Sequence, residues 1–238
     1  MPNLKARSYQ KELLDGDDIP FADIRSNMKE LNTINTYLGG HHITISGIKQ
    51  ILVKVGGITT ITICEIGCGG GDNLKAITKW CSANSVSVSC IGIDIKEECT
   101  TFAQQQYPEL KATWITSDYR DVKFAVQPDI IFSSLFCHHF DNGSIVAMLQ
   151  WMKANVTLGF FINDLHRHPL AYYSIKLITQ IFSKSYLVKN DAPLSVARGF
   201  TKGEWQNFIK QAGLSGCMVQ WKWAFRHLVV YCHTGVTA

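Results

Sequence analysis

The sequence lacks the long apolar runs that membrane proteins need. A transmembrane helix takes about 20 consecutive apolar residues, and the most apolar stretch, residues 160–181, is interrupted by charged residues, histidines and a proline. The first residues of the chain contain no apolar run of signal-peptide length. We therefore expect neither a membrane span nor a secretory leader.

The sequence also lacks a large excess of positive or negative charge. The 238 residues include 23 Lys and Arg and 19 Asp and Glu, which gives a net charge of +4, and the basic residues are scattered. Nucleic-acid-binding proteins carry a basic patch or tail, so nucleic acid is not an expected partner. Repeats are absent, and 46% of the residues are hydrophobic. The chain can bury one core, which predicts a single domain over residues 1–238.

Paired cysteine motifs are missing as well. The chain has eight cysteines but no Cys-x-x-Cys pair, so neither a zinc knuckle nor a thioredoxin-type motif is supported. Cys64, Cys90 and Cys232 lie in apolar runs, where a free cysteine behaves as a small hydrophobic residue. We expect reduced, mostly buried thiols, which indicates a cytoplasmic protein.

Short β-branched runs alternate with helical patterns through the middle of the chain. Strands are expected at 58–66, 86–94, 112–116, 129–133 and 157–163, with helices at 72–82, 97–107 and 142–155. Such alternation predicts βαβ units and a parallel sheet. Right-handed crossovers bring the carboxyl ends of the strands to one edge, where ligands bind.

The remaining segments predict two helical caps and a hairpin. Residues 1–57 have a helical pattern, and residues 165–200 combine a helix over 170–182 with an irregular loop. A capping-box spacing at 201–204 opens a further helix that runs to residue 212. The β-like runs at 216–222 and 225–232 predict a hairpin, which makes one edge strand antiparallel. The fold class is thus α/β, with a seven-stranded, mostly parallel sheet, helices on both faces, and caps over 1–57 and 165–200.

A glycine-rich loop joins the first strand to the next helix. Gly67, Gly69 and Gly71 allow a tight turn and a close approach by a ligand, and the helix N-terminus favours an anionic group. A dinucleotide fingerprint reads G-x-G-x-x-G, but its last glycine is replaced by Asp72 or Leu74 in the two possible frames. The spacing therefore disfavours an NAD-dependent oxidoreductase.

The pattern Glu65-x-Gly67-x-Gly69-x-Gly71, with Cys68 inside it, resembles motif one of class I methyltransferases, which depend on S-adenosylmethionine (SAM). The resemblance covers residues 60–165 and, more loosely, the end of the chain. It implies a Rossmann-like fold, SAM as cofactor and S-adenosylhomocysteine as product. The acidic Glu65 suits a ligand with an ammonium and a sulfonium group.

Further cofactor contacts are expected at the ends of the following strands. Asp94 ends the second strand, where a carboxylate accepts hydrogen bonds from ribose hydroxyls. Asp118 matches the acid that accepts from the adenine amino group in the family, and a turn-capping role is its alternative. Ile95 and Tyr119 are expected to flank the adenine.

The segment 128–140 resembles motif four of the same family and its following histidines. Ser133 and Ser134 in this segment are expected beside the methionine end of SAM. The histidine pair at 138–139 falls where the family often reads leucine, any residue, His-His-leucine.

Histidines at the ends of the fourth and fifth strands are candidate general bases. A base with a pKa near neutrality assists methyl transfer to oxygen. His166 is the first choice because it adjoins the cap, and His139 is the second. A structural hydrogen-bonding role is the alternative for each. No metal site is predicted, because the spacing of Asp164, His166 and His168 is loose.

The sequence thus predicts a SAM-dependent methyltransferase that acts on a small, rather apolar acceptor. The aromatic and apolar residues of the caps favour a hydroxyl of an aromatic or quinone-like metabolite. Methyl transfer to carbon or nitrogen remains open, as does a non-catalytic SAM-binding protein. The oligomeric state, monomer or homodimer, is also open.

Overall fold

The computed structural model describes residues 3–16 and 18–233. Residues 1–2, 17 and 234–238, which belong to the predicted domain 1–238 and in part to the cap 1–57, lie outside the described residues. The strands are β1 (Thr60–Ile66), β2 (Ser87–Asp94), β3 (Thr113–Thr116), β4 (Ile130–Ser134), β5 (Gly159–Leu165), β6 (Met218–Lys222) and β7 (Arg226–Cys232). The helices are α1 (Phe21–Tyr37), α2 (Gly40–Val55), α3 (Asp72–Ala83), α4 (Glu97–Gln106), α5 (Asn142–Ala154), α6 (Pro169–Phe182), α7 (Tyr186–Arg198) and α8 (Lys202–Gln211).

The strands form one sheet in the order β3-β2-β1-β4-β5-β7-β6. Strands β1 to β5 are parallel, and β7 pairs antiparallel with both β5 and β6. The predicted seven-stranded, mostly parallel α/β fold is therefore confirmed. The antiparallel strand of the hairpin is β7, and it lies second from the edge because the hairpin places β6 outside it.

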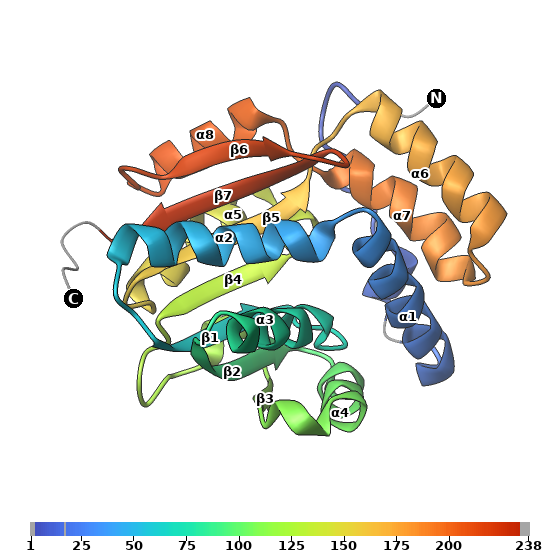
Figure 1. Cartoon of the computed structure of the whole chain (residues 1–238). Coiled ribbons are helices and arrows are strands. Elements are labelled where there is room, and N and C mark those ends of the chain that lie inside the picture. Colours follow the sequence, from blue (N-terminus) through green and yellow to red (C-terminus); the bar gives the residue numbers. More distant parts are fainter. Residues whose placement is uncertain (1–2, 17, 234–238) are drawn as a thin grey trace.

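Helices α2 and α3 cover one face of the sheet (Figure 1). Both helices contribute to a core with the inward side chains of β1, β5 and β7. Gly47 of α2 lies directly over the Phe161 ring, and a Cβ at this position would come within 2.5 Å of it. The missing side chain lets α2 pack closely on β5.

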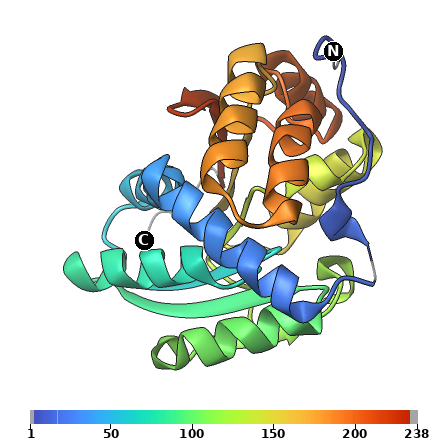
Figure 2. The ribbon, with the colours of Figure 1, turned by 90° about the vertical axis from the view of Figure 1, so that its right-hand side faces the viewer.

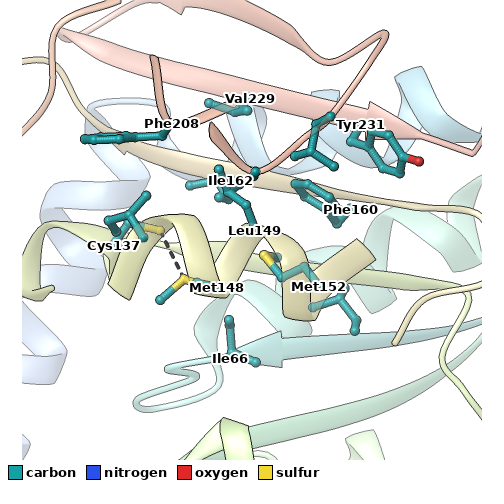
Figure 3. Packing of buried hydrophobic residues seen from close by; sticks show 14 of the residues in the cluster. Ile66, Cys137, Met148, Leu149, Met152, Phe160, Ile162, Phe208, Val229 and Tyr231 are labelled. Atoms are coloured by element: carbon teal, nitrogen blue, oxygen red, sulfur yellow. Dashed lines mark hydrogen bonds between the residues drawn. The ribbon is translucent and has the colours of Figure 1, made fainter. Parts of the chain in front are cut away.

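Helices α5 and α8 cover the opposite face. Four apolar residues of α5 recur at helical spacing and are fully buried, among them Met148 and Leu149. They pack with Phe160 and Ile162 of β5 and with Phe208 of α8 (Figure 3). Because both faces of β4 and β5 are covered, these strands are buried along nearly their whole length.

The helices α1, α6 and α7 lie beyond the carboxyl ends of the parallel strands (Figures 1 and 2). Helix α7 packs against both α1 and α6, so residues from the two predicted caps adjoin each other. The prediction of an irregular loop after residue 182 is wrong, because residues 186–198 form α7. Ser185 caps this helix by accepting from the Val188 N–H, and proline lies inside it at position 193.

The predicted helical pattern of residues 1–57 holds for α1 and α2 only. Residues 3–16 have no regular secondary structure apart from a single short 3-10 turn, η1 (Leu13–Asp15). This segment is attached by long-range hydrogen bonds instead, such as that from the Ser8 N–H to the Ala197 carbonyl. Helix α2 packs on the sheet itself, against β5 and β7.

All eight cysteines lie within the described residues, and all are free. Seven are buried and Cys217 is partly buried, as expected for thiols that act as small hydrophobic residues. Among residues 3–16 and 18–233, no helix combines the length and apolar character that crossing a membrane requires.

Candidate cofactor and active site

The glycine loop lies at the carboxyl end of β1 and leads directly into α3. Gly67, Gly69 and Gly71 have φ values of +69°, +50° and +79°, which other residues rarely adopt. Their surroundings differ. A Cβ on Gly67 would lie 2.2 Å from the Phe136 ring, whereas a Cβ on Gly69 would meet nothing within 4 Å. Gly67 is therefore required by packing, and Gly69 leaves open space where a ligand can approach.

Asp94 holds this loop from the end of β2. Its Oδ2 accepts from the Gly69 N–H at 2.9 Å, and its Oδ1 accepts from the Lys96 N–H at 3.0 Å. Burial raises the pKa of Asp94 above its usual value, although these two hydrogen bonds oppose the shift. A carboxylate has about four acceptor positions, so the two oxygens retain capacity for hydroxyl donors. The neighbouring Ile95 is 68% exposed, as an adenine contact requires.

Glu65 is buried at the end of β1. Its Oε1 accepts from Asn73 Nδ2 at 2.7 Å, but its Oε2 is buried without a hydrogen-bond partner. Burial raises the pKa of Glu65 well above its usual value, and the charges of Asp72 and Asp94 add to this. Buried polar atoms without partners are uncommon in folded proteins. A cationic ligand at this point would supply the missing donor.

The structure gives Asp118 and Tyr119 local roles. The Arg120 guanidinium and backbone N–H both donate to Asp118, and the Arg120 hydrogen bond lowers the pKa of this carboxyl. Tyr119 is 5% exposed and makes edge contacts with Phe136 and Trp151 in the core. Both residues lie beyond β3 as expected, and their contacts with adenine stay predictions.

Ser133 and Ser134 end β4, next to β1 in the sheet. Ser133 is fully buried and its Oγ contacts Cys137 Sγ at 3.4 Å. Ser134 Oγ accepts from Asn163 Nδ2, and the same amide donates to the carbonyl oxygen of Gly40 at the start of α2. Ser134 thus links β4 to a buried polar cluster at the start of α2, whereas Ser133 contacts Cys137 instead.

His166 follows β5 on the side that faces β7. Its ring lies 4.7 Å from His227 and 5.6 Å from His168, measured between centroids, and its Nδ1 is buried without a partner. Burial lowers the pKa of His166, and the charges of His168 and Arg167 lower it further. The neutral imidazole, which is the form that accepts a proton, is therefore favoured at pH 7.

His139 lies in the 3-10 turn η4 (Cys137–His139), directly after β4. Its Nδ1 is 2.9 Å from Asp15 Oδ1, and its side chain is 24% exposed. Its neighbour His138 is buried, with Nδ1 2.8 Å from Asp164 Oδ1. The two predicted bases therefore lie apart, His166 beside β7 and His139 beside the N-terminal segment.

Two residues of this edge are missing from the sequence-based prediction. Glu12 is buried against His138, although it comes from the N-terminal segment. Arg226, at the start of β7, donates to Asn35 Oδ1 through Nη2, while its Nε and Nη1 are buried without partners. Burial lowers the pKa of Arg226 to about 10. The sequence offered one signal for Arg226, because a charged residue there begins an apolar strand. It offered no comparable signal for Glu12. Arg167 is a further cation of this edge, and it pairs with Glu204 at 2.8 Å.

The chain matches known proteins at the levels of domain and fold. Residues 63–159 match the family model of a methyltransferase domain. The matched segment includes the glycine loop, Asp94 and the histidines after β4, and this similarity confirms the resemblance to methyltransferases found in the sequence.

Solved structures agree with this assignment of the fold. The plantazolicin methyltransferase in complex with SAH has a TM-score of 0.66 and 18% identity, with 90% of each chain covered. Magnesium protoporphyrin IX methyltransferase from Synechocystis PCC 6803 with bound SAM has a TM-score of 0.55 and 12% identity, covering 93% of this chain and 88% of that one. A putative O-methyltransferase from Nostoc punctiforme PCC 73102 has a TM-score of 0.58 and 12% identity, covering 86% of this chain and 59% of that one. A comparison with curated protein sequences gives no match.

The polar groups described above separate into two sets along the carboxyl edge of the sheet. One set, around the glycine loop, offers a buried acidic oxygen at Glu65 and further acceptor positions at Asp94. The other set, after β4 and β5, offers imidazoles and the Arg226 guanidinium. The first set can hold a cationic nucleoside, and the second can hold and deprotonate an acceptor.

Proposed function

We propose that the methyltransferase domain transfers a methyl group from SAM to a small, rather apolar acceptor. The acceptor atom is a hydroxyl oxygen of an aromatic or quinone-like metabolite. The observation that carries the proposal is the joint environment of Glu65 and Gly69. Glu65 offers a buried acceptor oxygen without a hydrogen-bond partner, and Gly69 offers open space at a left-handed turn.

These groups fit SAM, whose bound form supplies a methyl group on a sulfonium centre. Glu65 would face the ammonium end, with Ser133 and Ser134 beside it. Gly67, Cys68, Gly69 and Gly71 would line the nucleoside through their backbone. Asp94 would accept from the ribose hydroxyls, and Ile95, Asp118 and Tyr119 would surround the adenine. Similar folds are described with bound SAM or SAH, which supports SAM as cofactor and S-adenosylhomocysteine as product.

His166 would accept the hydroxyl proton of the acceptor, since burial and neighbouring charges favour its neutral form. His139 is the alternative base. The remaining contribution of the chain is to orient the acceptor and exclude water, which suffices for much of the rate of such a displacement. Residues 165–200 and 1–57 would close over the carboxyl edge of the sheet when the acceptor binds. The exposed Leu177, Ile181 and Phe182 of α6 then support an apolar acceptor.

The proteins with similar folds are named for varied substrates. Two are named for plantazolicin and magnesium protoporphyrin IX, and an O-methyltransferase family 2 protein from Planctomyces limnophilus was solved in complex with apigenin. Methyl transfer to carbon or nitrogen is therefore the second candidate. A non-catalytic SAM-binding protein is disfavoured by the intact acidic residues Glu65 and Asp94. The proposal includes a cytoplasmic location, no nucleic-acid partner, and a monomer or homodimer.

Calorimetry with SAM, S-adenosylhomocysteine and NAD tests the cofactor directly. We expect binding of the first two and none of NAD. A screen of metabolites with methyl-labelled SAM then identifies the acceptor class, and the labelled atom of the product separates transfer to oxygen from transfer to carbon or nitrogen. Tight NAD binding without SAM binding would overturn the proposal.

A further inference from the structure

Two neighbouring histidines after β4 are each oriented by a carboxylate. His138 Nδ1 lies 2.8 Å from Asp164 Oδ1, and His139 Nδ1 lies 2.9 Å from Asp15 Oδ1. An ionised carboxylate only accepts hydrogen bonds, so each Nδ1 carries the proton. Each Nε2 then presents a lone pair in the neutral ring. Histidines that bind metals have this arrangement, in which the second ring nitrogen donates to a carboxylate.

Both Nε2 atoms point toward the same buried carboxylate. Glu12 Oε1 lies 3.6 Å from His138 Nε2, and Glu12 Oε2 lies 3.9 Å from His139 Nε2. These separations are too long for direct hydrogen bonds. Two atoms that each lie about 2.1 Å from one tetrahedral ion are separated by about 3.4 Å. One ligand atom from each of Glu12, His138 and His139 lies within 4.8 Å of the others, so a small contraction suffices.

The charges around the cluster favour a cation. The carboxylates of Glu12, Asp15 and Asp164 all contact the histidine pair. Arg198 lies near two of them, but its guanidinium is also held by the carbonyl oxygens of His138 and His139. Ser195 Oγ donates to Glu12 Oε1, so Oε2 is the freer ligand atom. Access is available from the side of His139, which is 24% exposed.

We propose that Glu12, His138 and His139 bind one divalent transition-metal ion through the two Nε2 atoms and the Glu12 carboxylate. Two imidazoles and one carboxylate suit Zn²⁺ and its neighbours Co²⁺ and Ni²⁺ better than Mg²⁺ or Ca²⁺. Asp15 and Asp164 are positioning residues that orient the ligands. The ion connects the N-terminal segment to η4 and keeps one tetrahedral position open. His139 then acts as a ligand rather than as the alternative base.

The test uses the full chain after chelator treatment and dialysis, with Zn²⁺ in calorimetry and Co²⁺ in visible absorption. We expect one Zn²⁺ per chain and a Co²⁺ spectrum typical of a low-coordinate nitrogen and oxygen site. His139→Ala should weaken Zn²⁺ binding by at least about 100-fold, and Asp15→Asn by about 10- to 100-fold, as for other groups that orient ligands. Both side chains are partly exposed, so these variants should fold, which circular dichroism would verify.

His42→Ala is the matched control, because His42 is exposed on α2 and outside the cluster. It should bind Zn²⁺ as the unchanged protein does. His168→Ala examines the other histidine group, at the start of α6. Absence of stoichiometric Zn²⁺ and Co²⁺ binding, or loss of binding in His168→Ala but not in His139→Ala, would overturn the proposal. Because no measurement involves SAM, the result is independent of the proposed methyl transfer.

Discussion

The two polar regions at the carboxyl edge of the sheet are built in opposite ways. Around the glycine loop, hydrogen-bond partners are close in the chain, with Glu65 and Asn73 8 residues apart and Gly69 and Asp94 25 apart. Around the histidines after β4, His138 and Asp164 are similarly close, 26 residues apart, but the other partners come from distant segments, with His139 and Asp15 124 residues apart and Glu12 and Ser195 183 apart. The contacts of the glycine loop stay within neighbouring βα units, whereas the contacts of Glu12 and Asp15 with the histidines need the N-terminal segment in place.

Because of this difference, substitutions in the two regions should affect different properties of the protein. Changes at the glycine loop should weaken cofactor binding and leave the caps in place. Changes among the histidines should alter turnover or cap stability and leave cofactor binding intact. The following predictions test that separation, beginning with the largest expected effect.

Replacing His166 by alanine should affect turnover alone. Loss of a general base typically lowers the rate by about 100- to 10,000-fold, and His166 makes no contact with the glycine loop to disturb SAM binding. The measurement is kcat with the identified acceptor, together with the Kd for SAM from calorimetry. His42→Ala is the control. If His166→Ala keeps its rate while His139→Ala loses it, the base is assigned wrongly. If both retain their rates, the acceptor needs no base.

Asp94→Ala should weaken SAM binding strongly. The loss of two charge-assisted hydrogen bonds to hydroxyls amounts to about 2–3 kcal/mol. Asp121→Ala is the control, because Asp121 is an exposed acid after the neighbouring β3. Calorimetry with SAM measures both variants. Equal affinities would show that Asp94 only holds the loop through the Gly69 N–H.

Gly69→Val should weaken SAM binding by at least about tenfold, or 1.4 kcal/mol. A side chain here meets no protein atom within 4 Å, so it extends into the space proposed for the cofactor. Gly57→Val is matched, because Gly57 also has a positive φ and open space but lies outside the site. Both variants should lose similar stability from backbone strain, on the order of 1–2 kcal/mol, in thermal unfolding. A similar SAM affinity in the two would contradict the site.

The smallest effect concerns the ion pair beside the histidine region, between Arg167 and Glu204. Burial alone would raise the pKa of Glu204, but the Arg167 and Thr201 hydrogen bonds hold it below its usual value. The ionised Glu204 therefore stabilises the fold above the unfolded pKa of about 4.3, and this contribution is lost as the pH falls through the lowered pKa. Partly exposed pairs contribute less than about 1 kcal/mol. The melting temperature of wild type should exceed that of Glu204→Gln at pH 7, and the two should converge in acid. A difference in melting temperature that does not change with pH would show that the ionised form of Glu204 does not stabilise the fold.

The sequence-based predictions were accurate where structure follows from local pattern. The glycine loop, the capping box at Thr201 and the helices around them depend on residues a few positions apart, and all lie where expected. Helix α7 was missed because proline at position 193 and weak amphipathic character obscure it. The position of β7 follows from pairing between strands rather than from any run of residues. Glu12 was missed because its partner His138 lies 126 positions further along the chain, beyond any spacing rule.

The N-terminal segment also has a consequence for the time course of folding. Several of its attachments are to α7, far along the chain: the Ser8 N–H donates to the Ala197 carbonyl, and the Leu13 and Leu14 N–H groups donate to Asp191. Ser8, Leu13 and Leu14 therefore lack these partners until α7 is present. Contacts of such high sequence separation slow folding. Glu12 and Asp15 are separated from their histidines by more than 120 positions, so we expect their contacts to form later than the local contacts of the βα units.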